Sequence, residues 1–199
     1  VRNISLEAKK QPDKAQICGI VGHADLLSEN ISSILEKHLE EGQGLFKGIR
    51  HAGGWDHHDE IDNSHHHPQK NLYLSDKFSE GLNELENNDL SFEAWQYHHQ
   101  IKQVTLLAKE HPNLKIVLNH FSGPLGIGPY RGKQNEIFEI WKKDIDELAK
   151  NQNVYAKLGG LAMPINGYEF HKQAMPPSSD QLIEAQKKYY EFSIKSFGP

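Results

Sequence analysis

The sequence predicts an α/β fold built on parallel strands, either a doubly wound sheet or a barrel. Five short apolar runs alternate with five segments in which apolar residues recur every three or four positions. Strands that are separated by helices run parallel through right-handed crossovers, and continuously apolar strands are covered on both faces. With 199 residues, 37% of them hydrophobic, the chain is long enough for one sizeable core.

The elements are expected in strict alternation along the chain. Strands are expected within residues 17–26, 44–51, 90–97, 114–120 and 153–161. Each is followed by a helix pattern, carried by Ile31 to Leu39, Phe78 to Leu85, Ile101 to Ala108, Ile137 to Leu148 and Leu182 to Phe192. Ser28 and Ser75 are predicted N-caps, and Ser178 with Gln181 predicts a capping box. The longest irregular stretch is 51–74, and loops of that length in compact domains are usually functional.

Composition argues against several classes of protein. The net charge of −5 and the scattered lysines give no basic stripe for nucleic acid. No apolar run approaches the roughly 18 to 20 residues of a membrane helix, so neither nucleic acid nor a membrane is an expected partner. Cys18 is the single cysteine, which rules out an internal disulfide and fits a reducing compartment. We therefore expect a cytoplasmic protein that acts on a small molecule.

Polar residues close each of the five predicted strands. His23 ends the first strand, Arg50 and His51 the second, Trp95 and Tyr97 the third, His120 the fourth and Lys157 the fifth. Parallel strands place their carboxyl ends on one face, where barrels and doubly wound sheets bind ligands. These side chains, although distant in sequence, are therefore expected to converge on one site.

The strand-end residues also have structural interpretations. A histidine at a strand end can simply satisfy a turn, but the glycine-rich stretch after His120 lets the backbone approach a ligand, and Arg131 within it could meet a carboxylate. Arg50 and His51 lie on opposite sides of a strand, so only one of them should point inward. Trp95 and Tyr97 share a side, and core packing explains them as well as a pocket does.

Histidines are concentrated in the long loop, in "DHHDE" at 56–60 and "HHHP" at 65–68. Imidazole is a good ligand for zinc, copper and nickel. The spacing nevertheless matches no metal motif, and adjacent side chains in a mobile loop are not expected to face one ion. The pattern therefore favours adventitious metal binding over a built site.

Five blocks resemble a known family in composition and order. They are "GIVGHADL", "FKGIRHAGGWD", "SFEAWQYHHQI", "HPNLKIVLNHFSGPLGIGPYRG" and "NVYAKLGGLAMP". Together they look like the amidohydrolase-related (amidohydrolase 2) family of predicted metal-dependent hydrolases with the TIM-barrel fold, which includes sugar-acid lactonases and pyrone-dicarboxylate lactonases. The resemblance covers almost the whole chain.

This resemblance implies that residues 1–199 are one domain, an incomplete (β/α)8 TIM barrel containing about strands three to seven. The family's first strand with its His-x-His pair, its second strand, and its last strand with a water-activating Asp have no counterpart in this sequence. We therefore expect the chain to be a piece of a longer protein and to be inactive alone. Because its edge strands would be open, we expect poor solubility or a homo-oligomer.

The resemblance also implies roles for individual residues. His120 matches a histidine that polarises the substrate carbonyl or binds metal, and Arg50 matches an arginine that holds a substrate carboxylate or hydroxyl. For His23, His51, Trp95 and Tyr97 it implies a lining role. The implied reaction is attack of water on a lactone carbonyl, with a divalent metal such as zinc and a metal-independent reaction both open. The alternatives are a metal-dependent decarboxylase of the same superfamily and a non-catalytic binding protein or inactive fragment.

Overall fold

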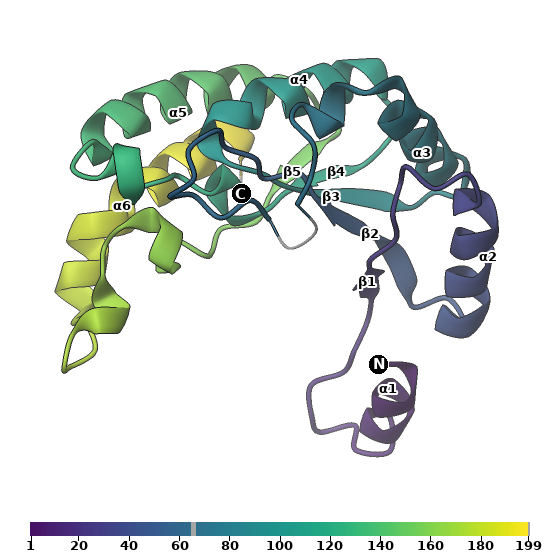
Figure 1. The fold of residues 1–199 in the computed structure, drawn as a ribbon. Helices are drawn as coiled ribbons and strands as arrows, with labels where there is room; N and C mark the ends of the chain where they lie inside the picture. The colour runs from purple at the N-terminus through teal and green to yellow at the C-terminus, as the bar shows by residue number, and fades with distance from the viewer. Residues whose placement is uncertain (65–66, 199) are drawn as a thin grey trace.

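A single parallel sheet of five strands organises the molecule (Figure 1). The computed structural model describes residues 1–64 and 67–198. The strands lie side by side in chain order, and every neighbouring pair is parallel; they are β1 (Ile20–Gly22), β2 (Phe46–Ala52), β3 (Ser91–Trp95), β4 (Ile116–Leu118) and β5 (Val154–Ala156). Each strand falls within the apolar run that predicted it, except that β2 extends one residue further, to Ala52.

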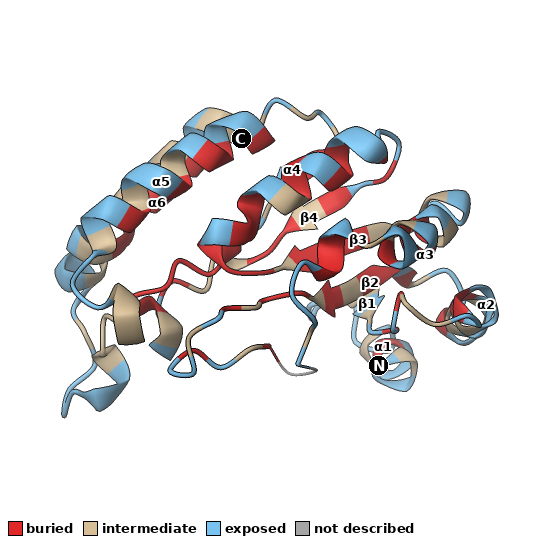
Figure 2. Ribbon diagram, turned by 45° about the horizontal axis from the view of Figure 1, so that its top comes forward, coloured by how far each residue is buried: buried red, intermediate tan, exposed pale blue. Residues whose placement is uncertain are grey.

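The helices cover only one face of this sheet (Figures 1 and 2). They follow the strands as expected and comprise α2 (Ile31–Gly42), α3 (Asp76–Asn87), α4 (Ile101–Glu110), α5 (Gln134–Leu148) and α6 (Ser179–Phe197). A doubly wound sheet has helices on both faces, whereas a (β/α)8 barrel has them only outside. The fold is therefore that of a TIM barrel, present as five βα units of an incomplete barrel, and the doubly wound alternative is wrong.

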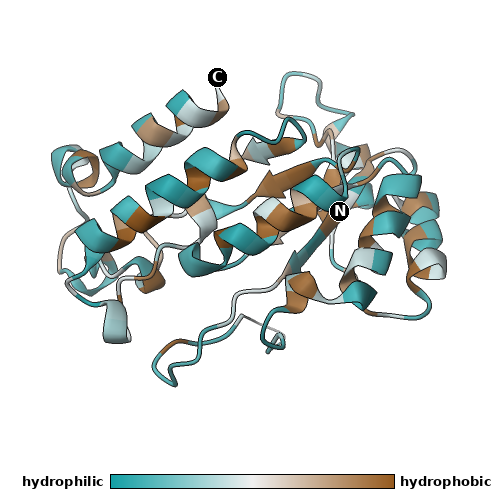
Figure 3. Ribbon diagram, turned by 90° about the horizontal axis from the view of Figure 1, so that it is seen from above, coloured by the Kyte–Doolittle hydropathy of each residue, from teal (hydrophilic) through white to brown (hydrophobic). Residues whose placement is uncertain are grey.

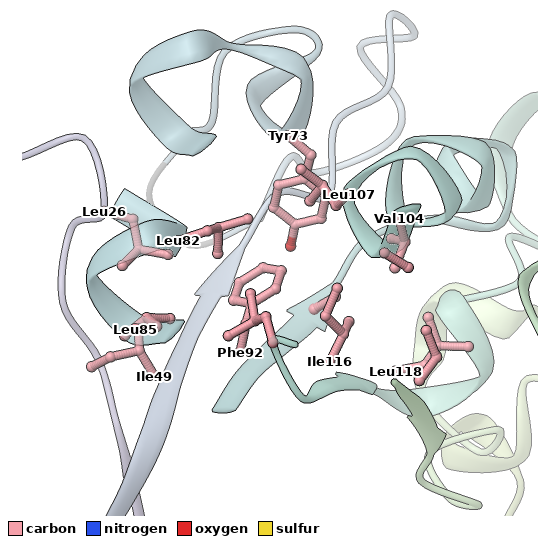
Figure 4. Close-up of a cluster of buried hydrophobic side chains, with 14 of the residues drawn as sticks. Leu26, Ile49, Tyr73, Leu82, Leu85, Phe92, Val104, Leu107, Ile116 and Leu118 are labelled. Atoms are coloured by element: carbon pink, nitrogen blue, oxygen red, sulfur yellow. The ribbon is translucent and has the colours of Figure 1, made fainter. Parts of the chain in front are cut away.

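The hydrophobic core lies between the strands and these outer helices (Figure 4). Ile49, Phe92 and Ile116 from three adjacent strands meet Leu82 and Val104 from the helices, and all five are fully buried. Figure 3 shows the complementary pattern, with hydrophobic stripes on the helices above the sheet and hydrophilic residues facing outward. Burial of this stripe is what holds each helix on its strand.

Strand register aligns the side chains of the inner face in one row across the sheet. Arg50 pairs with Glu93, Glu93 with Val117, and Val117 with Tyr155. Because paired residues on neighbouring strands point to the same side, Arg50 and Glu93 share the inner face. His51, one position later, turns to the helix side and packs against Phe78, as the strand alternation predicted.

Two of the three expected helix caps are confirmed. The Ser75 hydroxyl accepts a hydrogen bond from Phe78 N–H, and Ser178 and Gln181 form the full capping box. The cap at Ser28 was wrong, because α2 begins after Asn30, whose own N–H donates to the Ser28 hydroxyl.

A further helix, α1 (Arg2–Ala8), was not expected from the sequence. Figure 1 shows it apart from the helices that cover the sheet. None of its residues belongs to the main hydrophobic core. The segment therefore lacks the apolar periodicity from which the other helices were predicted. Among the described residues no helix is both long and apolar enough to cross a bilayer.

Gly81 in α3 sets the distance between this helix and the segment after β1. A Cβ at this position would collide with the carbonyl oxygen of Leu26. Replacement of a helical glycine by alanine ordinarily stabilises a helix. Here the close backbone approach outweighs that gain.

We expect Gly81→Ala to destabilise the protein by about 1–3 kcal/mol, the typical cost of forcing an extra carbon into a packed site. Denaturant unfolding monitored by circular dichroism measures the change. Asn83→Ala, at an exposed position of the same helix, is the matched control and should leave stability unchanged or slightly higher. Equal stability of Gly81→Ala and Asn83→Ala would contradict the packing argument.

Candidate functional site

A buried carboxylate joins the carboxyl ends of three strands. Glu93 is 2% exposed. Its carboxylate accepts hydrogen bonds from Arg50 Nε at 2.9 Å and Arg50 Nη2, and forms an ion pair with Lys157, which follows β5. Arg50 Nη2 also donates to Asn119 Oδ1 at 3.0 Å. Residues from β2, β3 and the segments after β4 and β5 thus form one polar network.

The electrostatics of this network favour an anionic ligand. Burial alone would raise the pKa of Glu93, but hydrogen bonds and charge from Lys157 and Arg50 lower it below its ordinary value. Glu93 is therefore ionised at neutral pH, and two cations against one anion leave one net positive charge. The side chains of Arg50 and Lys157 are 42% and 48% exposed, so both remain accessible from the inner face.

A strained turn begins at His120, two residues after β4 ends at Leu118. Residues 120–122 all have positive φ, between 51° and 57°, and Gly123 follows at 42°. Non-glycine residues rarely adopt this conformation in succession, and each costs on the order of 1 kcal/mol or more. Trp141 Nε1 donates to the Phe121 carbonyl at 2.7 Å and Gln96 to the Ser122 hydroxyl at 2.9 Å, which hold the turn.

His120 lies beside the polar network as a result of this turn. Burial is the main cause that lowers its pKa, and the positive charges of Arg50 and Lys157 act in the same direction; the Gly159 backbone and Glu93 oppose them. The imidazole is therefore neutral at pH 7. Its ring packs against Gly160, where the positive φ and the absence of a Cβ are both required.

His23 and His51 meet at a neighbouring pocket of about 260 Å³. Their ring centroids are 5.7 Å apart, and His23 Nδ1 lies 3.0 Å from the Arg50 carbonyl oxygen. His51 is buried, and its Nδ1 accepts the backbone N–H of Leu26. Both side chains therefore line one pocket at the carboxyl ends of β1 and β2. Their substrate-binding role remains a prediction.

The remaining predicted site residues, Trp95, Tyr97 and Arg131, contact partners other than Glu93. Trp95 and Tyr97 contact each other edge to face, and the Tyr97 hydroxyl donates to the Asp62 carbonyl. Tyr97 is 1% exposed and belongs to a small apolar cluster with Ile61 and Leu125, as its core-packing interpretation predicted. Arg131 does meet a carboxylate, but it is that of Glu169, at 3.4 Å on the surface. Their substrate-binding roles remain predictions.

A second polar cluster is centred on Asp56, in the long loop after β2. Its side chain is fully buried and accepts hydrogen bonds from Tyr130 at 2.6 Å and His58 at 2.7 Å; His99 Nε2 lies 2.9 Å away. Burial would raise the pKa of Asp56, but these hydrogen bonds lower it to about 2. The adjacent His57 and His58 both lie near the Asp56 carboxylate, with Nδ1 atoms 3.7 Å and 2.7 Å from Oδ1; His65 and His66 lie outside the described residues.

Two central residues were missed by the sequence analysis. Glu93 sits inside the apolar run "LSFEAWQY", where a lone charge at an inward position could have signalled a buried pair. Asp56 was counted only as one acid among the loop histidines. The sequence does not show these pairings, because Arg50 and Lys157 lie 43 and 64 residues from Glu93, and His99 and Tyr130 lie 43 and 74 residues from Asp56; only His58 is a close neighbour.

Comparison with known proteins identifies a matching protein family and a related bacterial protein. A family model described as "Amidohydrolase" matches residues 13–188. The uncharacterized protein y4mH of Sinorhizobium fredii is 28% identical over 167 residues, covering 84% of this chain and 52% of that protein.

Solved structures agree at the level of the fold. An amidohydrolase from Burkholderia multivorans superposes with a TM-score of 0.68 in its HEPES-bound crystal structure and 0.66 in its zinc-bound one, each at 21% identity over 100% of this chain and 62% of that one. A putative 2-pyrone-4,6-dicarboxylic acid hydrolase from Pseudomonas putida gives 0.57 at 13% identity, over 99% and 58%. The chain thus spans about half to three-fifths of the length of these relatives.

The strand-end residues do not form a ready zinc site. Both Glu93 oxygens are already bonded to cations, so a metal would have to displace Arg50 or Lys157. Within the described part of the chain, three ligand atoms gather closely only at Asp56, His57 and His58.

We expect Glu93→Gln to destabilise the protein by about 1–3 kcal/mol at pH 7, because two cations lose their buried partner. The pKa of Glu93 is lowered from 4.5 on folding, so its stabilisation is present above that value and is lost as the pH falls through the lowered pKa. The difference between wild type and variant should therefore begin to shrink as the pH falls below 4.5.

Urea unfolding at pH 7 and at pH 3.5 measures this difference. Glu184→Gln, at an exposed position of α6, is the control for loss of one charge. A stability difference that does not change with pH would show that the ion pairs do not carry it.

Proposed function

Because the chain belongs to the amidohydrolase family, we propose that the protein is a hydrolase that opens a lactone of a small carboxylated molecule, such as a sugar acid or a carboxylated ring. The proposal rests on the positively charged network of Arg50, Glu93, Asn119 and Lys157, which we call the strand-end network, and on the neutral His120 beside it. The network supplies a site for a substrate carboxylate, and the histidine supplies a hydrogen-bonding group that carries no charge.

Arg50 and Lys157 are assigned to substrate binding. Arg50 uses Nε and Nη2 for Glu93 and Asn119, and the described residues offer no partner to its Nη1. Together with the exposed portion of Lys157, this leaves donors that can meet a substrate carboxylate. Glu93 fixes both side chains in place, so little conformational entropy is lost on binding.

His120 is assigned to the reacting carbonyl. In lactone hydrolysis the water oxygen bonds to the carbonyl carbon, the ring C–O bond breaks, and the released oxygen takes up a proton to give an open hydroxy acid. Negative charge develops on the carbonyl oxygen in between, and a neutral imidazole donates one N–H to such an oxyanion. The lowered pKa keeps the imidazole neutral over the physiological range.

The test is lactone hydrolysis by the product of the natural reading frame, with sugar-acid lactones and carboxylated pyrones as substrates. We expect His120→Ala to lower kcat/KM by about 100-fold or more, the typical effect of losing one such group. His171→Ala, which removes an exposed histidine from the short helix η6 (Phe170–Lys172), should have no effect. Release of CO2 from an unsaturated acid without lactone opening would instead support the decarboxylase, and no turnover of either class would support a binding protein.

The same assay predicts a pH dependence. Because the pKa of His120 is lowered from 6.5, the neutral form persists as the pH falls below that value. We therefore expect kcat/KM to remain constant from pH 7.5 to 6.5 and to decline only at lower pH. An acid limb centred above pH 6.5 would contradict the assignment of His120.

A further inference from the structure

The Asp56 cluster differs from the strand-end network in chemistry and position. It lies in the loop after β2 and joins three loops at the strand-end edge. Asp56 meets His58 within its own loop, His99 in the short helix η2 (His98–Gln100) after β3, and Tyr130 in η4 (Gly128–Tyr130) after β4. Two imidazoles and one carboxylate with ligand atoms within 4.8 Å of one another constitute a metal-ligand set.

The loop that carries these residues is firmly held. Gln100 accepts the Trp55 N–H at 3.0 Å and donates to the Gly53 carbonyl at 2.9 Å. Asn63 accepts the Asp56 N–H at 2.6 Å. The expectation that adjacent histidines cannot face one ion assumed a mobile loop, and these bonds remove that assumption.

We propose that Asp56, His57 and His58 bind a divalent transition metal ion of the zinc type in the loop after β2. Tetrahedral zinc with bonds of about 2.0–2.1 Å separates its ligand atoms by about 3.3 Å. The two Nδ1 atoms lie 3.7 Å (His57) and 2.7 Å (His58) from Asp56 Oδ1, values on either side of that separation. Small side-chain rotations would therefore complete the set, with a fourth position left for water.

The two carboxylate oxygens of Asp56 have separate roles in this site. Oδ1 faces the loop histidines, whereas Oδ2 accepts the hydroxyl of Tyr130 and lies 2.9 Å from His99 Nε2. Partners on the far oxygen of a metal-binding carboxylate orient it and tune its affinity. Tyr130 and His99 are therefore positioning residues. Imidazole together with carboxylate favours zinc, nickel or copper over calcium or magnesium, which prefer oxygen ligands.

Titration of the metal-free chain with Zn2+, followed by calorimetry, tests the site, and visible absorption of bound Co2+ reports its coordination. We expect one ion per chain in wild type and at least tenfold weaker binding in His57→Ala and in His58→Ala. His57 has a 67% exposed side chain, so its loss should not affect folding. Tyr130→Phe should weaken binding about tenfold and shift the Co2+ spectrum through the carboxylate alone.

Three controls separate this site from other sources of binding. Asp59→Asn removes an exposed acid from the same loop and His171→Ala an exposed histidine elsewhere, and neither should change affinity. His120→Ala should also have no effect, because the strand-end network is separate. The proposal is overturned if no stoichiometric ion binds, if His57→Ala and His58→Ala bind as wild type does, or if binding is lost only when the histidines of the 65–67 run are replaced.

Discussion

The buried ion pairs of Glu93 are the constraint on which the strand-end edge depends. A carboxylate that is almost fully buried must be paired, and its two partners come from strands on either side of β3 in the sheet. The pairing therefore ties the carboxyl ends of β2, β3 and β5 to one another. Apolar side chains of the same volume would pack as well, but they would leave no charge at the edge where ligands bind in this fold.

The strained turn after β4 lies at the same edge of the sheet and is held by the hydrophobic core. Residues 120–122 adopt a conformation that non-glycine residues avoid, and packing of Phe121 against Trp141 and Tyr190 together with the Trp141 hydrogen bond holds them there. The result is that the chain turns sharply as it leaves the sheet and His120 stays beside Arg50 and Lys157. Strain stored at a ligand-binding edge and held by the core is a recurring arrangement in enzymes.

The sequence predicted the fold more completely than the site. All five strands and their helices follow from local apolar periodicity, which needs no knowledge of distant residues. The choice of a barrel over a doubly wound sheet followed only from the family resemblance, because periodicity does not tell which face the helices cover. Glu93 was missed because its partners lie 43 or more positions away, and Asp56 because His99 and Tyr130 do, although His58 is close in sequence. Ser28 failed as a cap because Asn30, two residues later, precedes the helix.

The two polar clusters at the carboxyl ends of the strands differ in charge, and they therefore suit ligands of opposite charge. The Glu93 network carries a net positive charge and remains accessible, which suits an anionic substrate. The Asp56 cluster has its anion fully buried among imidazoles, so it suits a cation that replaces the proton between Asp56 and His58. A cation bound there would hold the carboxylate that His99 and Tyr130 contact from the loops after β3 and β4, and it would lie apart from the Arg50 and Lys157 cations. Rigid loops around an accessible cationic site are what a hydrolase of small carboxylated esters requires.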